Sequence, residues 1–198
     1  MKVAFDTDAF CKLGAADLLE AAASAFGERA ATCGRLPALP YMLERGTLQR
    51  RYGPDVCGRL LPIVRSMRSV AEPSAASLEP MLGLHGVDPG EAQLFAVCAE
   101  AGITIITGDR RAVCALRGVP ALVPKISGRI VVLEALLLHL CAVAGAAAVR
   151  RKAATVAQYD TMLECCFSPN EPEPERCLRS YFDRLKTDAS PLALWSPQ

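Results

Sequence analysis

Histidine is scarce in this chain, and cysteines at a metal-binding spacing are missing. The 198 residues include two histidines and nine cysteines, and no two cysteines form a Cys-X-X-Cys arrangement. Structural zinc sites need such clusters of cysteine and histidine, and a disulfide framework normally uses an even number of cysteines. We therefore expect free thiols that pack as small hydrophobic side chains, and a reducing, cytoplasmic location.

An excess of charge of either sign is also lacking, because the formal net charge is +1. The overall charge therefore gives no reason to expect nucleic acid as a partner. The basic residues are mostly arginine and cluster locally, for example at Arg50–Arg51, Arg110–Arg111 and Arg150–Arg151. Arginine suits two-point contacts to phosphate, so these clusters are candidate phosphate-binding groups, with solvated helix faces as the alternative.

Neither a signal-peptide pattern nor a clear membrane-spanning pattern is present. Asp6 and Asp8 interrupt the first residues, which would otherwise be a short apolar stretch. The longest apolar run, Ile130 to Val149, contains Glu134 and His139. We expect this run to be a helix buried in the core or in a subunit interface, and we expect no membrane association.

The chain does contain a helix, a strand and an acidic turn in close succession. Asp88 is a good N-cap for a helix that begins at Pro89, and Gly102 is suited to end that helix. The β-branched run 103–107 that follows is typical of a buried parallel strand. Asp109 comes directly after this strand, and in open α/β sheets the functional site lies at the carboxyl ends of the strands.

A second acidic turn follows the first predicted strand, residues 2–5. This strand ends in Asp6, so Asp6 and Asp109 meet at one edge if the two strands lie parallel in one sheet. Glu91, one turn into the predicted helix, is placed to join them. Clustered carboxylates repel one another, and the sequence therefore predicts a divalent cation at this edge.

The remaining segments predict a helix-rich α/β chain with 52% hydrophobic residues. We expect a three-layer α/β/α domain over residues 1–127, with a short, mainly parallel central sheet of four or five strands, and a C-terminal helical extension over residues 128–198. The last dozen residues carry no clear signal and are expected to be mobile. The expected helices are 9–26 divided at Gly14, 41–45, 50–67 bent at Pro62, one within 71–86, 129–145, 149–166 and 175–186, and the further strands are 32–33 and 121–123.

The order of these acidic residues resembles the PIN-domain family of metal-dependent ribonucleases, which includes the VapC-type toxins of toxin–antitoxin pairs. The resemblance covers roughly residues 1–123. It implies four catalytic acids: Asp6 after the first strand, Glu44 on an early helix, Glu91 in Gly-Glu-Ala and Asp109 in Thr-Gly-Asp-Arg-Arg. Asp8 departs from the neutral residue that is common there, and is either a further metal-shell group or a helix cap.

The resemblance implies a Mg²⁺ or Mn²⁺ cofactor and hydrolysis of RNA to a 5′-phosphate and a 3′-hydroxyl. The expected metal-binding residues are Asp6, Asp8, Glu91 and Asp109. The expected contacts to the substrate are Thr7, Thr107, Arg110 and Arg111. The expected partners are RNA, an antitoxin protein that covers the acidic pocket, and a second copy of the chain in a homodimer.

Other interpretations stay open. Asp6-Thr7-Asp8 after a strand, and the strand that leads to Thr107, also resemble the first two motifs of haloacid-dehalogenase-type phosphatases, with Asp6 as the nucleophile. The later pair of acids that this family uses for Mg²⁺ does not follow, although Lys125 would serve as its lysine. A third interpretation is a PIN-like fold with a decayed site that binds RNA or protein.

The candidate acids also have structural interpretations. Asp8 would cap the next helix, and Glu44 would be an exposed helix residue. Glu91 stands three residues after Asp88, the spacing of a capping box. Asp109 would cap a helix that begins at Arg110.

Overall fold

The computed structural model describes residues 1–197 and has a five-stranded parallel sheet at its centre. The strands lie in the order β3-β2-β1-β4-β5, so β2 and β3 lie on one side of β1 and the later strands β4 and β5 lie on the other. β1 and β4 therefore flank the switch point of the sheet, which is where open α/β proteins place ligand sites. The strands are β1 (Val3–Phe5), β2 (Gly34–Arg35), β3 (Arg68–Ser69), β4 (Thr104–Thr107) and β5 (Ile130–Val132).

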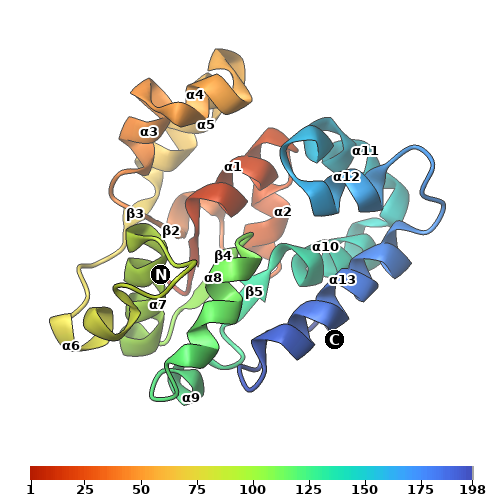
Figure 1. Cartoon of the computed structure of the whole chain (residues 1–198). Coiled ribbons are helices and arrows are strands. Elements are labelled where there is room, and N and C mark those ends of the chain that lie inside the picture. Colours follow the sequence, from red (N-terminus) through yellow and green to blue (C-terminus); the bar gives the residue numbers. More distant parts are fainter. Residues whose placement is uncertain (198) are drawn as a thin grey trace.

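Helices cover both faces of the sheet and give an α/β/α fold with a C-terminal helical region (Figure 1). The α-helices are α1 (Thr7–Ala15), α2 (Leu19–Ser24), α3 (Leu39–Arg45), α4 (Thr47–Tyr52), α5 (Pro54–Ser66), α6 (Ala75–Leu78), α7 (Pro89–Ala101), α8 (Arg110–Ala115), α9 (Val123–Ile126), α10 (Leu133–Ala144), α11 (Ala146–Ala153), α12 (Thr161–Phe167) and α13 (Pro174–Ala189). Right-handed crossovers place the helices between β1 and β3 on one face and those between β3 and β5 on the other. In agreement, α1 packs against α5, and α7 packs against α9.

The central helix and strand form where the sequence predicts them. Asp88 caps α7, Pro89 occupies its first turn, and Gly102 ends it in the left-handed conformation with φ 64°. β4 then pairs with β1 in parallel, and Ile106 lies opposite Phe5. This register sets the residues that follow the two strands side by side at the carboxyl edge.

Several elements differ from the sequence prediction. β3 was not predicted, β2 follows the expected strand 32–33, and the first helix is divided after Ala15 and not at Gly14. The expected helix 50–67 is divided at Gly53 into α4 and α5.

The run 121–123 is not a strand, because residues 123–126 form the short helix α9. The fifth strand is instead Ile130–Val132, at the start of the run that was predicted to be helical from residue 129. Its β-branched side chains are fully buried and its backbone pairs with β4, which outweighs the helical character of the leucines that follow.

The leucine-rich part of the apolar run, residues 133–141, is mostly buried inside this chain, whereas residues 142–145 are exposed. Leu136, Leu137 and Leu140 of α10 are buried, and the helix packs against α13 and α2. The apolar character of α10 therefore gives no support to the homodimer, which stays a prediction. In residues 1–197 we find no helix that combines the length and the apolar composition needed to cross a bilayer.

The segment after α13 is held against β5 and does not fit the mobile end that we expected. The amide of Trp195 donates to the carbonyl of Ile130 at 2.9 Å, and the amide of Gly128 donates to the carbonyl of Ala193 at 2.7 Å. These contacts cover the outer edge of β5, which would otherwise expose unpaired backbone groups.

Candidate functional site

Thr107, the last residue of β4, joins the acidic residues that follow β1 and β4. Its hydroxyl accepts from the amide of Asp109 at 3.1 Å and donates weakly to Oδ2 of Asp6 at 3.4 Å. Thr107 is 1% exposed and lines neither of the two pockets described below, so its predicted contact to the substrate has no support from this arrangement. The amide of Asp6 donates to the carbonyl of Ile106 at 2.9 Å, which fixes the backbone at the same point. The ends of the two central strands thus bring Asp6 and Asp109 together, as the parallel arrangement predicts.

The start of α7 adds Asp88 and Glu91 to this edge. The amide of Glu91 donates to Asp88 Oδ1 at 2.8 Å, and the amide of Asp88 donates to Glu91 Oε2 at 2.8 Å, which is a complete capping box. The structural interpretation of Glu91 is therefore confirmed. It does not exclude a functional role, because the cap occupies one oxygen of Glu91 and the same side chain lines a pocket.

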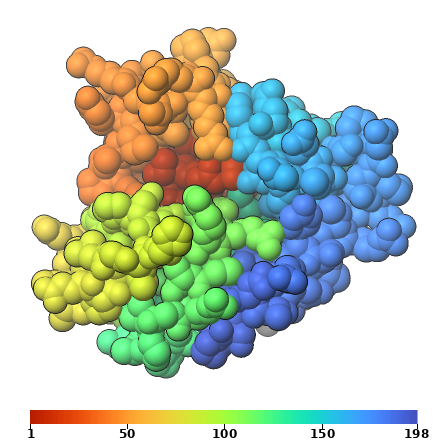
Figure 2. Space-filling view, in the orientation of Figure 1, coloured from red at the N-terminus to blue at the C-terminus, as the bar shows by residue number. Residues whose placement is uncertain are grey.

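The acidic residues line a pocket of about 460 Å³ at the switch point. Figure 2 shows the hollow, in which N-terminal residues (red) are visible between α3–α5 (orange), α7 (yellow-green) and the C-terminal helices (blue). Apolar side chains of the segment 36–48 and Arg51 form the opposite wall. Its polar lining residues are Asp6, Thr7, Asp8, Arg51, Asp88, Glu91 and Asp109.

A second pocket, of about 660 Å³, continues from the first. Asp88, Glu91 and Asp109 line both pockets, so these three acids stand at the boundary between them. The second pocket adds basic side chains and a histidine, namely Arg111, Arg117 and His85. A negatively charged polymer that contacts these groups would pass directly over the acids.

The ionised forms of Asp6 and Glu91 are unfavourable in the folded chain, and the pKa values of both are raised. Burial, followed by repulsion from Asp8, raises the pKa of Asp6 to about 7. Burial also raises the pKa of Glu91 to about 8, against the stabilising amide of Asp88. Neither residue belongs to any ion pair within residues 1–197. A cation at this edge would offset the repulsion among these carboxylates, which no basic side chain of the described residues offsets by an ion pair to Asp6 or Glu91.

These shifts predict that the protein without metal loses stability as the pH rises from about 4 to about 8. In that range the unfolded chain releases the protons of Asp6 and Glu91 while the folded chain retains them, so the free energy of unfolding falls. The two raised pKa values correspond to a decrease of about 4 to 5 kcal/mol for each residue and of up to about 9 kcal/mol for the pair, measured by urea unfolding with a chelator present. The double variant Asp6→Asn/Glu91→Gln should flatten the profile, and an equal slope in both proteins would contradict the assignment.

Asp109 is oriented by the helix that it caps. One oxygen accepts from the amides of Arg111 at 2.8 Å and Ala112 at 3.0 Å, so its structural interpretation as a helix cap is confirmed. The guanidinium of Arg111 approaches the other oxygen at 3.4 Å, but this side chain is 84% exposed. An exposed pair of this length is weak, and Asp109 is therefore open to a stronger partner.

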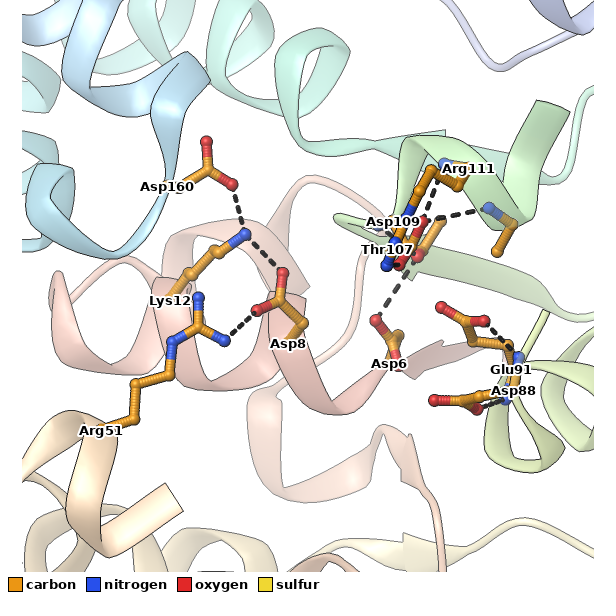
Figure 3. A network of polar contacts seen from close by, with 11 residues as sticks. Asp6, Asp8, Lys12, Arg51, Asp88, Glu91, Thr107, Asp109, Arg111 and Asp160 are labelled. Atoms are coloured by element: carbon orange, nitrogen blue, oxygen red, sulfur yellow. Dashed lines mark hydrogen bonds and ion pairs between the residues drawn. The ribbon is translucent and has the colours of Figure 1, made fainter. Parts of the chain in front are cut away.

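Asp8 belongs to a network that links the N-terminal helix to the C-terminal region (Figure 3). The buried ammonium of Lys12 pairs with both Asp8 and Asp160, and Arg51 approaches Asp8 at 3.4 Å. Burial opposes the charge on Lys12, but the two carboxylates outweigh this effect, so its pKa is raised. Arg51 also donates to the carbonyl of Tyr159 at 2.6 Å, next to Asp160.

The sequence did not identify this network or the second pocket. The spacing of Asp8 and Lys12, four residues apart on one helix, is a signal that could have suggested the first pair. Asp160 lies 148 residues from Lys12, and no local pattern connects them. The sequence predicts Asp88 only as the N-cap of α7, and the structure shows that Asp88 also lines the pocket.

Two further predicted site residues, besides Thr107, line neither pocket. Glu44 on α3 pairs with Arg65 at 2.5 Å and lines neither of the two pockets. Arg110 turns toward the C-terminal region, where its Nε lies 3.8 Å from Glu134 and its guanidinium stacks over Tyr181. Their roles in catalysis and substrate binding stay predictions, without support from this arrangement.

The carboxylates converge on the pocket without forming a finished coordination sphere. Within the described part of the chain, no group of three or more His, Cys, Asp or Glu side chains is placed to hold one metal ion. Mg²⁺ is nevertheless often bound through one or two carboxylates, with water and substrate phosphate completing its shell. The buried oxygen donors Asp6 and Glu91, with their raised pKa values, fit such a cation.

Comparison of the chain with protein-family models, with curated proteins and with solved structures finds no significant match. The function therefore has to be inferred from the site itself.

Proposed function

We propose that this protein is a PIN-like, Mg²⁺- or Mn²⁺-dependent endoribonuclease that acts at the switch point of its sheet. The observation that supports this most is a pair of buried carboxyl groups, Asp6 and Glu91, that share one pocket with Asp109 and lack a cationic side chain as partner. Such an arrangement is unfavourable for the folded chain alone, and a divalent cation beside a phosphate would make it favourable.

Each acid has a distinct role in the proposed site. Asp6 and Asp109, at the ends of adjacent strands, would hold the cation, which supplies charge that offsets the negative charge developing on the phosphate. Glu91 lines the same pocket, and its carboxylate would orient the attacking water and accept its proton. Water then adds to phosphorus, the bond between phosphorus and the 3′-oxygen breaks, and the 3′-oxygen takes a proton from solvent. The products carry a 5′-phosphate and a 3′-hydroxyl.

The second pocket would hold the RNA strand beside the reacting phosphate. Arg111 and Arg117 are exposed there, and arginine binds phosphate through two parallel hydrogen bonds. An inhibitory partner such as an antitoxin would use the same acids, by placing an arginine between Asp6 and Glu91.

The test is cleavage of a single-stranded RNA by the purified protein, with Mn²⁺ or with a chelator. We expect internal cleavage with Mn²⁺, none with the chelator, and 5′-phosphate ends on the new fragments. Turnover of a small phosphomonoester without RNA cleavage would instead favour the haloacid-dehalogenase-type interpretation. RNA binding without cleavage in the presence of Mg²⁺ or of Mn²⁺ would favour the third interpretation, a PIN-like fold with a decayed site.

The second pocket predicts a specific loss of RNA affinity. In an Asp6→Asn background, which prevents cleavage, Arg111→Ala should weaken binding of single-stranded RNA about tenfold. It should also reduce the slope of log affinity against log salt by about 0.7, since one phosphate contact is lost. Fluorescence anisotropy at several salt concentrations measures both quantities.

Arg184→Ala is the matched control, because Arg184 is an exposed arginine on α13 that pairs with Asp188 and lines neither pocket. Equal effects of the two substitutions would contradict an RNA path through the second pocket.

A further inference from the structure

Two cysteines of the C-terminal region lie in near contact. Cys166, near the end of α12, and Cys177, in the first turns of α13, have their sulfur atoms 2.8 Å apart. Both are free thiols. A disulfide bond is about 2.05 Å long, so a shift of less than about 1 Å would join them.

The two thiols differ in their access to solvent. Cys166 is buried, and burial, together with the hydrogen bond to Cys177, raises its pKa. Cys177 is partly exposed and lines a surface pocket of about 420 Å³ with Arg176, Ser180 and Tyr181. A small oxidant can therefore reach the sulfur of Cys177 from solvent, whereas the sulfur of Cys166 is buried next to it.

The sequence neighbour of the pair provides a natural comparison. Cys165 is exposed, but within the described residues the thiol that is hydrogen-bonded to Cys177 is that of Cys166. Exposure alone would favour oxidation of Cys165, whereas the geometry favours Cys166.

We propose that Cys166 and Cys177 form a peroxide-sensitive dithiol that closes to a disulfide between α12 and α13. The thiol of Cys177 releases its proton, the thiolate attacks hydrogen peroxide, and the O–O bond breaks. A sulfenic acid and hydroxide form, and the hydroxide takes up the released proton to give water. The sulfur of Cys166 then attacks the sulfenic sulfur and displaces hydroxide, which takes the proton of Cys166 and leaves as a second water. In total, two thiols and one peroxide give one disulfide and two waters, and a thiol reductant reverses the change.

This bond would join two helices that both contact the acidic edge. Asp160, the N-cap of α12, pairs with Lys12, and Lys12 in turn holds Asp8. On α13, the ring of Tyr181 lies beneath Arg110, which begins the helix after Asp109. The proposal itself rests on the sulfur geometry and is independent of the proposed nuclease activity.

The experiment treats the full-length folded protein with hydrogen peroxide and then alkylates the remaining thiols in denaturant. Mass spectrometry of the intact protein should show a loss of two alkylated thiols and of two hydrogen atoms. Both changes should be reversed by dithiothreitol before alkylation. Proteolysis should yield one linked species that joins the peptide of Cys166 to the peptide of Cys177.

Cys165 and Cys166 fall in the same peptide, so the linked peptides alone do not distinguish a Cys166–Cys177 bond from a Cys165–Cys177 bond. Substitution of each cysteine distinguishes the two. Cys177→Ser and Cys166→Ser should each abolish the linked species, and Cys165→Ser should retain it. Cys177 is only partly buried, so Cys177→Ser serves as the informative variant even if Cys166→Ser folds poorly. A link that persists in Cys166→Ser but disappears in Cys165→Ser would overturn the proposal, as would oxidation of Cys177 to a sulfinic acid without any link.

Discussion

Asparagine in place of Asp6 is expected to lower metal-dependent RNA cleavage by about 1,000-fold while increasing the stability of the metal-free protein. Asp6 is 6% exposed, and its pKa is raised to about 7, so its charge is unfavourable in the folded chain above that pH. Asparagine has a similar shape, can still accept the hydrogen bond of Thr107, and removes the charge. It therefore removes the group that would hold the cation and also a source of repulsion.

The measurement pairs initial rates of RNA cleavage with urea unfolding in a chelator above pH 8. We expect a stabilisation of up to about 4 kcal/mol in the variant, because the raised pKa of Asp6 corresponds to that cost in the native protein. Asp183→Asn is the matched control, since Asp183 is an exposed acid on α13 that pairs with Lys186. Cleavage by Asp6→Asn within tenfold of the native rate would contradict the proposed role.

Methionine in place of Lys12 is expected to destabilise the protein by about 3 kcal/mol. Lys12 is the buried cation between Asp8 and Asp160, and its removal leaves two carboxylates facing each other. Methionine retains most of the apolar stem, so the loss reports mainly on the charge. Arg51 still approaches Asp8, which places the effect at the lower end of the range for a broken buried pair.

A second substitution identifies the cause of that loss. Asp160→Asn retains the cap of α12, where Asp160 Oδ1 accepts from the amide of Leu163 at 3.0 Å, but removes one of the opposed charges. In the Lys12→Met background it should recover at least about 1 kcal/mol. Urea unfolding of the two single variants and the double variant measures this coupling, and additive losses would show that the network is not held together by charge.

The parts of the fold that follow local rules were predictable. Asp88 and Gly102 mark the ends of α7, and the β-branched run before Asp109 marks β4. The convergence of Asp6 and Asp109 followed from one further assumption, that the two strands lie parallel, and the register of β1 against β4 confirms it. The all-parallel sheet and the α/β class follow from the same alternation of strand and helix.

Long-range contacts and overlapping signals were not predictable. Ile130–Val132 lies at the start of an apolar run whose leucines favour a helix, so the strand was recognisable only through its pairing with β4. The role of Asp160 depends on a contact across 148 residues. Glu44 matched the acidic pattern by its position along the chain, but its orientation on α3 toward Arg65 is a matter of tertiary packing.

The most direct test of the acidic site is calorimetric titration of Mn²⁺ into the folded protein, in parallel with Asp6→Asn and Asp183→Asn. We predict saturable binding to the native protein, with release of protons near pH 7, because Asp6 must lose its proton to bind the cation and the cation's charge lowers the pKa of the neighbouring Glu91. Asp6→Asn should bind at least about tenfold more weakly, and Asp183→Asn should bind as the native protein does. Equal binding by all three proteins, or no binding by any of them, would contradict a metal site built on Asp6.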